Sequence, residues 1–142
     1  MGCGTWGLPL VAWVYCQKTG LLYDPSGTKA GQGYSGHPPY VNDPAAQERA
    51  SQGPTPRGRY HITGPPKDTA EHGPYVLRLD PDALTREWIK GYGRNPDSFL
   101  IHGKLSNEFG KATGLASLGC IALDRPQRVA IWQSQDHDLL VF

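Results

Sequence analysis

Short apolar stretches separated by Gly, Pro and Asp dominate the pattern of hydrophobic and polar positions along the chain. Residues 11–15 and 21–23 are apolar and flank a turn that contains Gly20, which predicts a β-hairpin. Residues 31–40 are rich in Gly and Pro and predict a loop. One further strand is predicted to begin at about Arg59. Four others are predicted over residues 75–79, 99–102, 120–123 and 139–142.

Short helices are predicted from capping residues rather than from long periodic stretches. Asp43 and Pro44 are typical of an N-cap and a first helical residue, and Gly53 limits that helix to about residue 51. Residues 82–90 have weak helical character, and Asp124 is the expected N-cap of a helix over residues 125–133. The predicted fold class is therefore mainly β, with two or three short helices.

Composition supports this pattern and excludes some classes of function. The 18 glycines and 13 prolines favour turns between strands. The net charge of +1 gives no electrostatic footprint for nucleic acid, and no apolar run approaches the roughly 20 residues of a membrane span. The 142 residues suffice for a single domain, in which we expect residues 1–10 to be an N-terminal extension.

Two of the predicted strands each carry one reactive side chain, His102 and Cys120. An imidazole beside a thiol can take its proton and stabilise the resulting thiolate. Gly119 permits a sharp turn before Cys120, and the backbone amides around these two residues are natural donors to an oxyanion. The alternative is structural, because a free Cys in an apolar strand is usually a core residue.

The order of these residues resembles a known active-site signature. His102-Gly103, a loop rich in Gly and polar residues, and then Ser117, Gly119 and Cys120 resemble the signature of the L,D-transpeptidases. Papain-like and cell-wall amidase-type cysteine enzymes have the opposite order, with Cys before His.

The resemblance extends over residues 13–123. An ordered set of motifs looks like the L,D-transpeptidase-type effectors of bacterial type VI secretion: Trp13-Val-Tyr15-x-Gln17-x-x-Gly20, Tyr34-Ser35-Gly36, Asn42, Gly53-Pro54-x-Pro56-x-Gly58-x-Tyr60-x-Ile62, Phe99-Leu-Ile-His102-Gly103 and Ser117-x-Gly119-Cys120-Ile121. The resemblance implies the L,D-transpeptidase β-sandwich as the fold and the peptide stems of peptidoglycan as the substrate.

The same resemblance assigns roles to individual residues. It implies that Cys120 is the nucleophile and His102 the base, with Gly119 and Ser117 completing the catalytic turn. Ser117 is expected to hydrogen-bond the turn or to orient His102, and a plain turn serine is the alternative. The residues expected to contact the substrate are Tyr34, Ser35, Gly103 and Arg57, and for Tyr34 and Ser35 the alternative is an ordinary loop residue.

Two positions depart from the family pattern. Leu118 stands where many L,D-transpeptidases have His, and Ala122 stands where an Arg is common. A second imidazole and a substrate-facing guanidinium are therefore absent from their usual places. The positive charge for a stem carboxylate is expected from Arg125, Arg57 or Arg59.

The resemblance implies an antibacterial enzyme that removes or exchanges the terminal D-alanine of tetrapeptide stems. Its expected partners are the stem peptides, a cognate immunity protein and a component of the secretion apparatus. No signal peptide is evident, so we expect synthesis in the cytoplasm, secretion, and action in the periplasm of a target cell. The alternative is a non-catalytic peptidoglycan-binding module of the same fold.

The remaining cysteines and histidines have simpler interpretations. Cys3 and Cys16 are the expected partners of any disulfide, which leaves Cys120 as a thiol. His72 and His37 lie in Gly- and Pro-containing loops, where we expect them to be solvated. No Cys-x-x-Cys or His-x-x-x-His spacing is present, so neither a metal nor a cofactor is expected.

Overall fold

The computed structural model describes residues 12–104 and 119–142. These residues form a mainly β fold with two α-helices and one short 3₁₀ helix. The strands are β1 (Trp13–Tyr15), β2 (Leu21–Tyr23), β3 (Lys29–Gln32), β4 (Tyr34–Ser35), β5 (Gly58–Thr69), β6 (Gly73–Pro81), β7 (Leu100–His102), β8 (Ile121–Ala122) and β9 (Asp138–Val141). The helices are η1 (Pro44–Ala46), α1 (Ala83–Gly91) and α2 (Arg125–Gln133).

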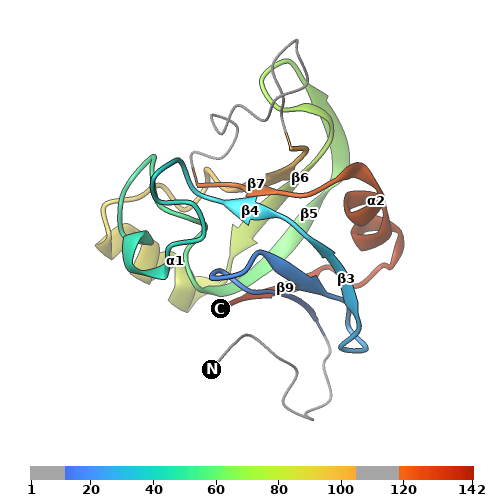
Figure 1. The fold of residues 1–142 in the computed structure, drawn as a ribbon, viewed down its shortest axis with the longest axis horizontal. Coiled ribbons are helices and arrows are strands. Elements are labelled where there is room, and N and C mark those ends of the chain that lie inside the picture. The colour runs from blue at the N-terminus through green and yellow to red at the C-terminus, as the bar shows by residue number, and fades with distance from the viewer. Residues whose placement is uncertain (1–11, 105–118) are drawn as a thin grey trace.

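All described strands belong to one sheet, with the order β3-β2-β1-β9-β5-β6-β7-β8-β4. The two outermost strands, β3 and β4, are separated in the chain only by Gly33, so one segment forms both ends of the sheet. The sheet therefore curls on itself, and Figure 1 shows β3 and β4 crossing in front of β5. A side chain at position 33 would collide with the carbonyl oxygen of Ala122, so only glycine permits this crossing.

The core lies inside the curled sheet and is made of alternate residues of its strands. Its members are fully or nearly fully buried: Trp13, Tyr15, Leu22, Tyr60, Ile62, Leu77, Leu79, Phe99, Ile101, Ile121, Leu123, Leu139 and Val141. Ile89 of α1 and Ile131 of α2 complete it. The two helices thus cover the core from different sides of the sheet, as Figure 1 shows.

Most of the predicted elements are confirmed, including the starts of both α-helices, although the Asp124 side chain makes no capping hydrogen bond. α1 begins after Asp82, whose carboxylate accepts a hydrogen bond from the Thr85 amide at 2.9 Å. α2 covers the predicted residues 125–133 and follows Asp124, with Pro126 in its first turn. The predicted hairpin is formed by β1 and β2. Neither α-helix in the described part of the chain is long and apolar enough to span a membrane.

Two predicted segments differ in the structure. The helix expected from Pro44 to about residue 51 is reduced to the 3₁₀ turn η1, because the amides of Gln47 and Arg49 bond to carbonyls three residues earlier and the chain continues in turns. The expected loop over residues 31–40 contains the end of β3 and all of β4. The small side chains there carried no apolar alternation, and backbone pairing with β2 and β8 makes these residues strands.

Candidate active site

The candidate catalytic residues lie at two adjacent parallel strands: His102 is the last residue of β7, and Cys120 directly precedes β8. In the β7–β8 pair, Ile101 is opposite Ile121 and His102 is opposite Ala122. Ile101 and Ile121 point into the core, so His102 and Ala122 point to the other face of the sheet. Cys120 lies in the bend directly before β8, two residues before Ala122, and by extending the strand alternation one residue we infer that its side chain lies on the face that carries His102. We call this surface of β4 to β8 the dyad face.

The imidazole of His102 is held in one orientation by the backbone. Its Nδ1 lies 2.8 Å from the carbonyl oxygen of Gly103, which can only accept a hydrogen bond. Nδ1 therefore carries the proton of the neutral ring, and Nε2 is the atom that can act as a base. Gly103, expected to contact the substrate, is placed here as the residue that orients His102.

His72 is a neighbour of the dyad and not a solvated loop residue. Its ring stacks on that of His102, with a centroid distance of 4.9 Å and an interplanar angle of 27°. The antiparallel β5–β6 hairpin brings it there, because β6 pairs with β7 and the connection of the hairpin extends past the end of β7. A second imidazole therefore lies beside the base although position 118 is Leu.

Cys120 is buried, with 7% of its surface exposed, and it is not part of a disulfide. Its Sγ lies 3.7 Å from the carbonyl oxygen of Ser98. Burial raises the pKa of the thiol to about 11, while a hydrogen bond from the Leu100 backbone and the charge of Arg94 act in the opposite direction. The resting thiol is thus protonated at neutral pH and needs a base to become a nucleophile.

Two buried hydroxyl groups fix the turn that carries the nucleophile. The Thr55 hydroxyl donates to the carbonyl oxygen of Gly119, and the Ser35 hydroxyl donates to that of Cys120 at 2.8 Å. Ser35 also accepts a hydrogen bond from the Thr55 amide at 2.8 Å. Since the Gly119–Cys120 peptide is trans, fixing its carbonyl aims the Cys120 N–H in the opposite direction, where it can meet an oxyanion.

Ser35 was expected to contact the substrate, but the structure places it beneath the nucleophile. It is fully buried and lies opposite Ile121 in the β4–β8 pair, on the core side of the sheet. Gly119 occupies its predicted place in the turn, where a φ of 120° and the adjacent guanidinium of Arg94 both favour glycine.

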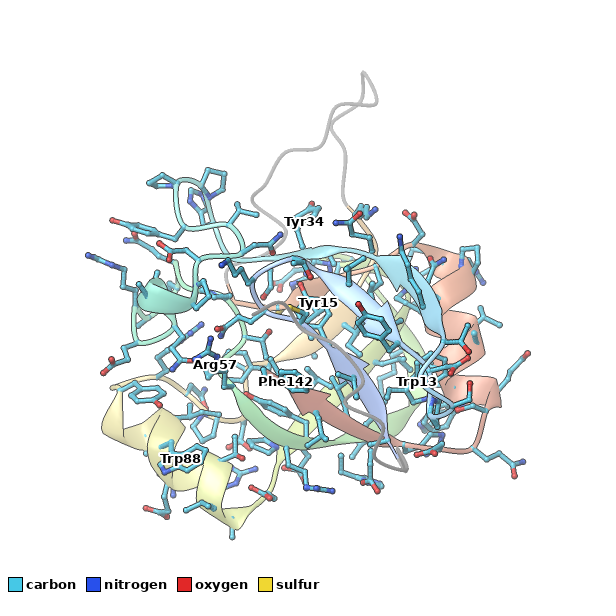
Figure 2. All side chains as sticks on the ribbon, turned by 60° about the horizontal axis from the view of Figure 1, so that its bottom comes forward. Trp13, Tyr15, Tyr34, Arg57, Trp88 and Phe142 are labelled. Carbon is cyan, nitrogen blue, oxygen red and sulfur yellow. The ribbon has the colours of Figure 1, made fainter. Side chains whose placement is uncertain are left out.

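Tyr34 is the predicted substrate contact that reaches the dyad face. It lies directly opposite Ala122 in the β4–β8 pair, so its side chain points to the same side as those of His102 and Cys120. Its hydroxyl is buried and has no hydrogen-bond partner within residues 12–104 and 119–142. Figure 2 shows Tyr34 on the β4 segment at the top of the molecule.

Arg94 is a site residue that sequence reasoning missed. Its guanidinium, 6% exposed, donates to the carbonyl oxygens of Gln47 at 2.6 Å, Pro54 at 2.7 Å and Gly53 at 3.2 Å. These acceptors are neutral, and no carboxylate of the described part of the chain forms an ion pair with it. A permanent positive charge therefore lies beside the Gly119–Cys120 turn. A lone Arg between Gly93 and Asn95 gave no sequence signal.

The arginines expected from the sequence lie elsewhere. Arg57 is exposed, and its described hydrogen bond runs from its backbone amide to the side chain of Gln47 at 3.0 Å. In Figure 2 it lies below Tyr34, on the side of the molecule that holds α1. Arg125 lies over the ring of Tyr75, at 5.5 Å from its centroid. Neither guanidinium makes a described contact with His102 or Cys120.

Some predicted residues lie outside the described part of the chain. Ser117 and Cys3 belong to this group, so their predicted roles stay predictions. Cys16 is disulfide-bonded, which agrees with the expectation that Cys120 keeps its thiol. Within the described residues, no three His, Cys, Asp or Glu side chains are grouped in a way that could hold a metal ion.

Comparison with solved structures identifies the fold. The chain is similar to a mutant of the L,D-transpeptidase of Enterococcus faecium, with a TM-score of 0.55 and 15% identity over 94% of this chain and 50% of that one. It is also similar to the helical cell shape determining protein Pgp2 of Campylobacter jejuni, with a TM-score of 0.56 and 16% identity over 99% of this chain and 49% of that one. The chain thus spans about half the length of these structures.

Sequence comparison identifies the family. No curated protein matches significantly. A family model described as the Tlde1 domain matches residues 29–139, which include β3 to α2, the first half of β9, the dyad and Arg94. The predicted L,D-transpeptidase-like fold is confirmed, and the chain belongs to the Tlde1 domain family.

Proposed function

We propose that this protein is a cysteine-dependent L,D-carboxypeptidase or L,D-transpeptidase that acts on the tetrapeptide stems of peptidoglycan. The observation that supports the proposal is the β7–β8 register, which puts His102 beside the strand that Cys120 directly precedes, while the Gly103 carbonyl engages Nδ1 of His102 and leaves Nε2 as the base. The family and the fold support a peptidoglycan-modifying enzyme.

The first half of the reaction forms an acyl-enzyme. Nε2 of His102 takes the proton of the Cys120 thiol, and the sulfur attacks the carbonyl carbon at the L-centre of diaminopimelate. The backbone amide of Cys120 stabilises the oxyanion of the tetrahedral intermediate. When the intermediate collapses, the C–N bond to the terminal D-alanine breaks, and the departing amine takes the proton from His102.

The second half depends on the acceptor. Water, deprotonated by His102, attacks the thioester and releases a tripeptide stem, which is carboxypeptidase activity. A free D-amino acid as acceptor gives exchange, and the amine of a neighbouring stem gives a crosslink. In each case the sulfur leaves as the thiolate and regains its proton from His102, so Cys120 is regenerated.

We further propose that the enzyme is an antibacterial effector delivered by type VI secretion. It is made in the cytoplasm, carried by a component of the secretion apparatus, and acts on stems in the periplasm of a rival cell. A cognate immunity protein protects the producing cell. The ordered motifs and the Tlde1 domain match support this role. Trimming removes the tetrapeptide donors that a victim needs for its own crosslinks.

A non-catalytic peptidoglycan-binding module is the second candidate. Two observations favour it: Ala122 lacks the guanidinium common at that position, and burial raises the pKa of the Cys120 thiol. A module of this kind would bind sacculi without altering the stems.

Incubating the purified protein with disaccharide tetrapeptides and following the products by mass spectrometry distinguishes the enzyme from the binding module. We expect loss of one alanine from each stem, or its replacement when another D-amino acid is added. Cys120→Ala should abolish the product and keep the fold, because it removes only one small side chain. His102→Gln should slow the reaction strongly.

Each other outcome has a definite meaning. Turnover that survives Cys120→Ala would place the chemistry elsewhere. Retention on sacculi without any product would establish the binding module. Cleavage of unrelated protein substrates would indicate a general cysteine protease.

A further inference from the structure

A groove lies on the dyad face, next to the nucleophile. It has a volume of about 350 Å³ and lies over β5, β6 and β7, where Thr63, Lys67, Val76, Arg78 and Leu100 line it. The sheet register pairs Thr63 with Arg78, Lys67 with Val76, and Arg78 with Leu100. Paired residues point to the same side of a sheet, so all these side chains share one face.

Leu100 connects the groove to the dyad. It precedes His102 by two residues on β7, so both side chains lie on the same face. Its backbone also makes a hydrogen bond to Cys120 that helps to lower the pKa of the thiol. The groove and the nucleophile therefore share Leu100, and from this residue the groove extends along the sheet toward Thr63 and Lys67.

The charge of the groove is positive. Lys67 and Arg78 are the ionisable residues that line it, and no acidic side chain does. Lys67 is exposed and forms no ion pair with the residues that the structure describes. Val76 and Leu100 supply an apolar surface between the charged groups. A ligand that fits this groove is a short peptide that carries carboxylates.

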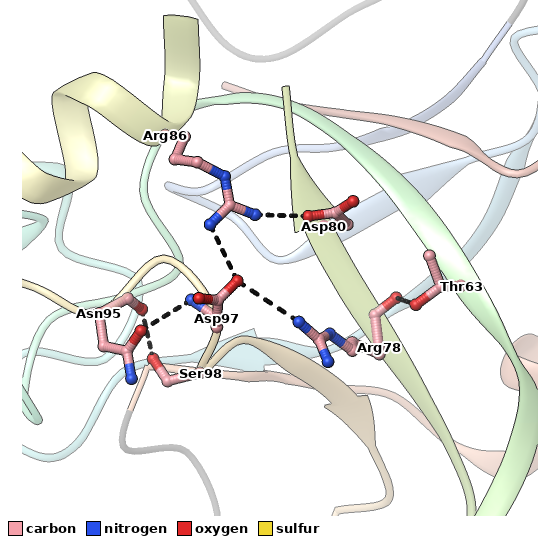
Figure 3. Close-up of polar contacts among 7 residues, drawn as sticks. All are labelled: Thr63, Arg78, Asp80, Arg86, Asn95, Asp97 and Ser98. Carbon is pink, nitrogen blue, oxygen red and sulfur yellow. Dashed lines mark hydrogen bonds and ion pairs between the residues drawn. The ribbon is translucent and has the colours of Figure 1, made fainter. Parts of the chain in front are cut away.

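Arg78 can turn toward such a ligand because it is held loosely. Its Nη2 lies 3.4 Å from Asp97, and both side chains are 53% exposed. Asp97 is bound more closely by Arg86, at 2.9 Å, and Arg86 also pairs with Asp80. Figure 3 shows Arg86 between the two aspartates and Arg78 at the margin of the cluster. Asp97 thus keeps a partner when Arg78 leaves it.

We propose that this groove binds a carboxylate of the acyl-donor stem, with Lys67 and Arg78 as its counter-ions. The inference rests on the proposed function and assigns the positive charge that Ala122 does not supply. A tetrapeptide stem carries one carboxylate on D-glutamate and one on the side chain of diaminopimelate. Both are acidic groups on the acyl side of the scissile bond, whose carbonyl carbon Cys120 attacks in the proposed reaction.

The test compares Lys67→Gln, Arg78→Gln and the double variant by steady-state kinetics on the tetrapeptide. Each change removes a charged hydrogen bond, so we expect KM to rise about tenfold per residue while kcat changes little. Lys29→Gln is the matched control, since Lys29 is an exposed lysine of β3 outside the groove. Asp97→Asn breaks the same contact as Arg78→Gln but keeps the cation, so it should not raise KM.

Two modified substrates identify the bound group. If the amidated stem already has a high KM and the double variant raises it no further, the amidated carboxylate is the one that the groove binds. Amidation at D-glutamate and at diaminopimelate are tested separately. A double variant with the KM of Lys29→Gln on every substrate would overturn the proposal.

An incorrect assignment of the carboxylate-binding groove can be distinguished from an incorrect assignment of the enzymatic activity. Cys120→Ala should still bind the intact tetrapeptide, and Lys67→Gln in that background should weaken the binding measured by calorimetry. Binding that depends on Lys67 without turnover in the wild type would support the groove and contradict the enzyme. Turnover in the wild type, together with substrate binding that does not depend on Lys67 and Arg78, would support the enzyme and contradict the groove.

Discussion

At the residue scale, two opposing effects decide the reactivity of Cys120. Burial removes water from the sulfur and raises the pKa of the thiol, whereas the charge of Arg94 lowers it. The guanidinium of Arg94 is fixed by three backbone carbonyls, so its charge needs no rearrangement during the reaction. We therefore propose that Arg94 supplies part of the positive charge that an Arg after the nucleophile would supply.

Arg94→Gln should make Cys120 less reactive at a given pH. Losing the positive charge disfavours the thiolate, so the pKa rises further and the pH profile of alkylation by iodoacetamide moves to higher pH. Arg94→Lys keeps the charge and should stay closer to the wild type.

Arg128→Gln is the control for the stability effect in this experiment. Arg128 is also buried and donates to the carbonyls of Leu123, Pro74 and Tyr75, but it lies beside Gly103 and not beside Cys120. It should lower the melting temperature without moving the profile. An unchanged profile for Arg94→Gln would remove Arg94 from the site.

Tyr34→Phe should reduce activity without reducing stability. The Tyr34 hydroxyl is buried and finds no partner in residues 12–104 and 119–142, so deleting it costs the fold nothing and can raise the free energy of unfolding by up to about 1 kcal/mol. If the hydroxyl donates to the substrate on the dyad face, kcat/KM falls about tenfold.

Tyr15→Phe is the matched control for Tyr34→Phe. The Tyr15 hydroxyl is also buried without a partner in the described residues, but Tyr15 lies in the core on β1. Its loss should leave kcat/KM unchanged. Equal kinetics for the two variants would show that Tyr34 has no role in binding.

At the scale of elements, the catalytic turn depends on segments far away in the chain. Ser35 comes from β4 and Thr55 from the stretch before β5, and together they hold the carbonyls of Gly119 and Cys120. Ser98, on the connection from α1 to β7, lies against the thiol. The turn is therefore shaped by these contacts as well as by its own glycine.

Thr55→Val should lower kcat more than it raises KM. Valine keeps the shape of threonine but leaves the Gly119 carbonyl without its donor, which costs about 1–3 kcal/mol of stability and frees the peptide to rotate. The Cys120 amide then no longer points at the oxyanion. Thr55→Ser restores the hydroxyl and should rescue kcat, and a failure of this rescue would assign Thr55 to packing alone.

The sequence predicted the elements whose signals are local. Helices α1 and α2 were placed correctly because Asp82 and Asp124 mark their starts, and the dyad could be predicted because His102-Gly103 and Gly119-Cys120 are short motifs. β3 and β4 were missed because Gly31 and Gly33 interrupt any apolar alternation there. Both strands are stabilised instead by backbone pairing with β2 and β8. Arg94, Thr55 and His72 were missed for the same reason, since only the sheet topology brings them to the site.

At the scale of the whole molecule, the curled sheet has the hydrophobic core on one side and the dyad face on the other. The β3–β4 segment closes the sheet, and β4 then extends the surface already formed by β5, β6, β7 and β8. Tyr34, the dyad and the groove consequently lie in series on one face, with Cys120 between Tyr34 and Lys67 in strand order. If the proposed function holds, we expect an extended stem peptide to bind in this order, with its scissile bond at Cys120.

The proposed substrate also predicts where the protein is harmful. Stems with a terminal D-alanine are assembled into the wall outside the cytoplasmic membrane, so expression in the cytoplasm should be tolerated. The same chain behind a secretory signal should stop growth or swell the cells, since Cys16 is already oxidised and Cys120 stays outside the disulfide in an oxidising compartment. Growth curves and microscopy measure the effect, and exported Cys120→Ala should be harmless at the same protein level. Equal toxicity in both compartments would contradict a cell-wall target, and toxicity of exported Cys120→Ala would contradict a cysteine nucleophile.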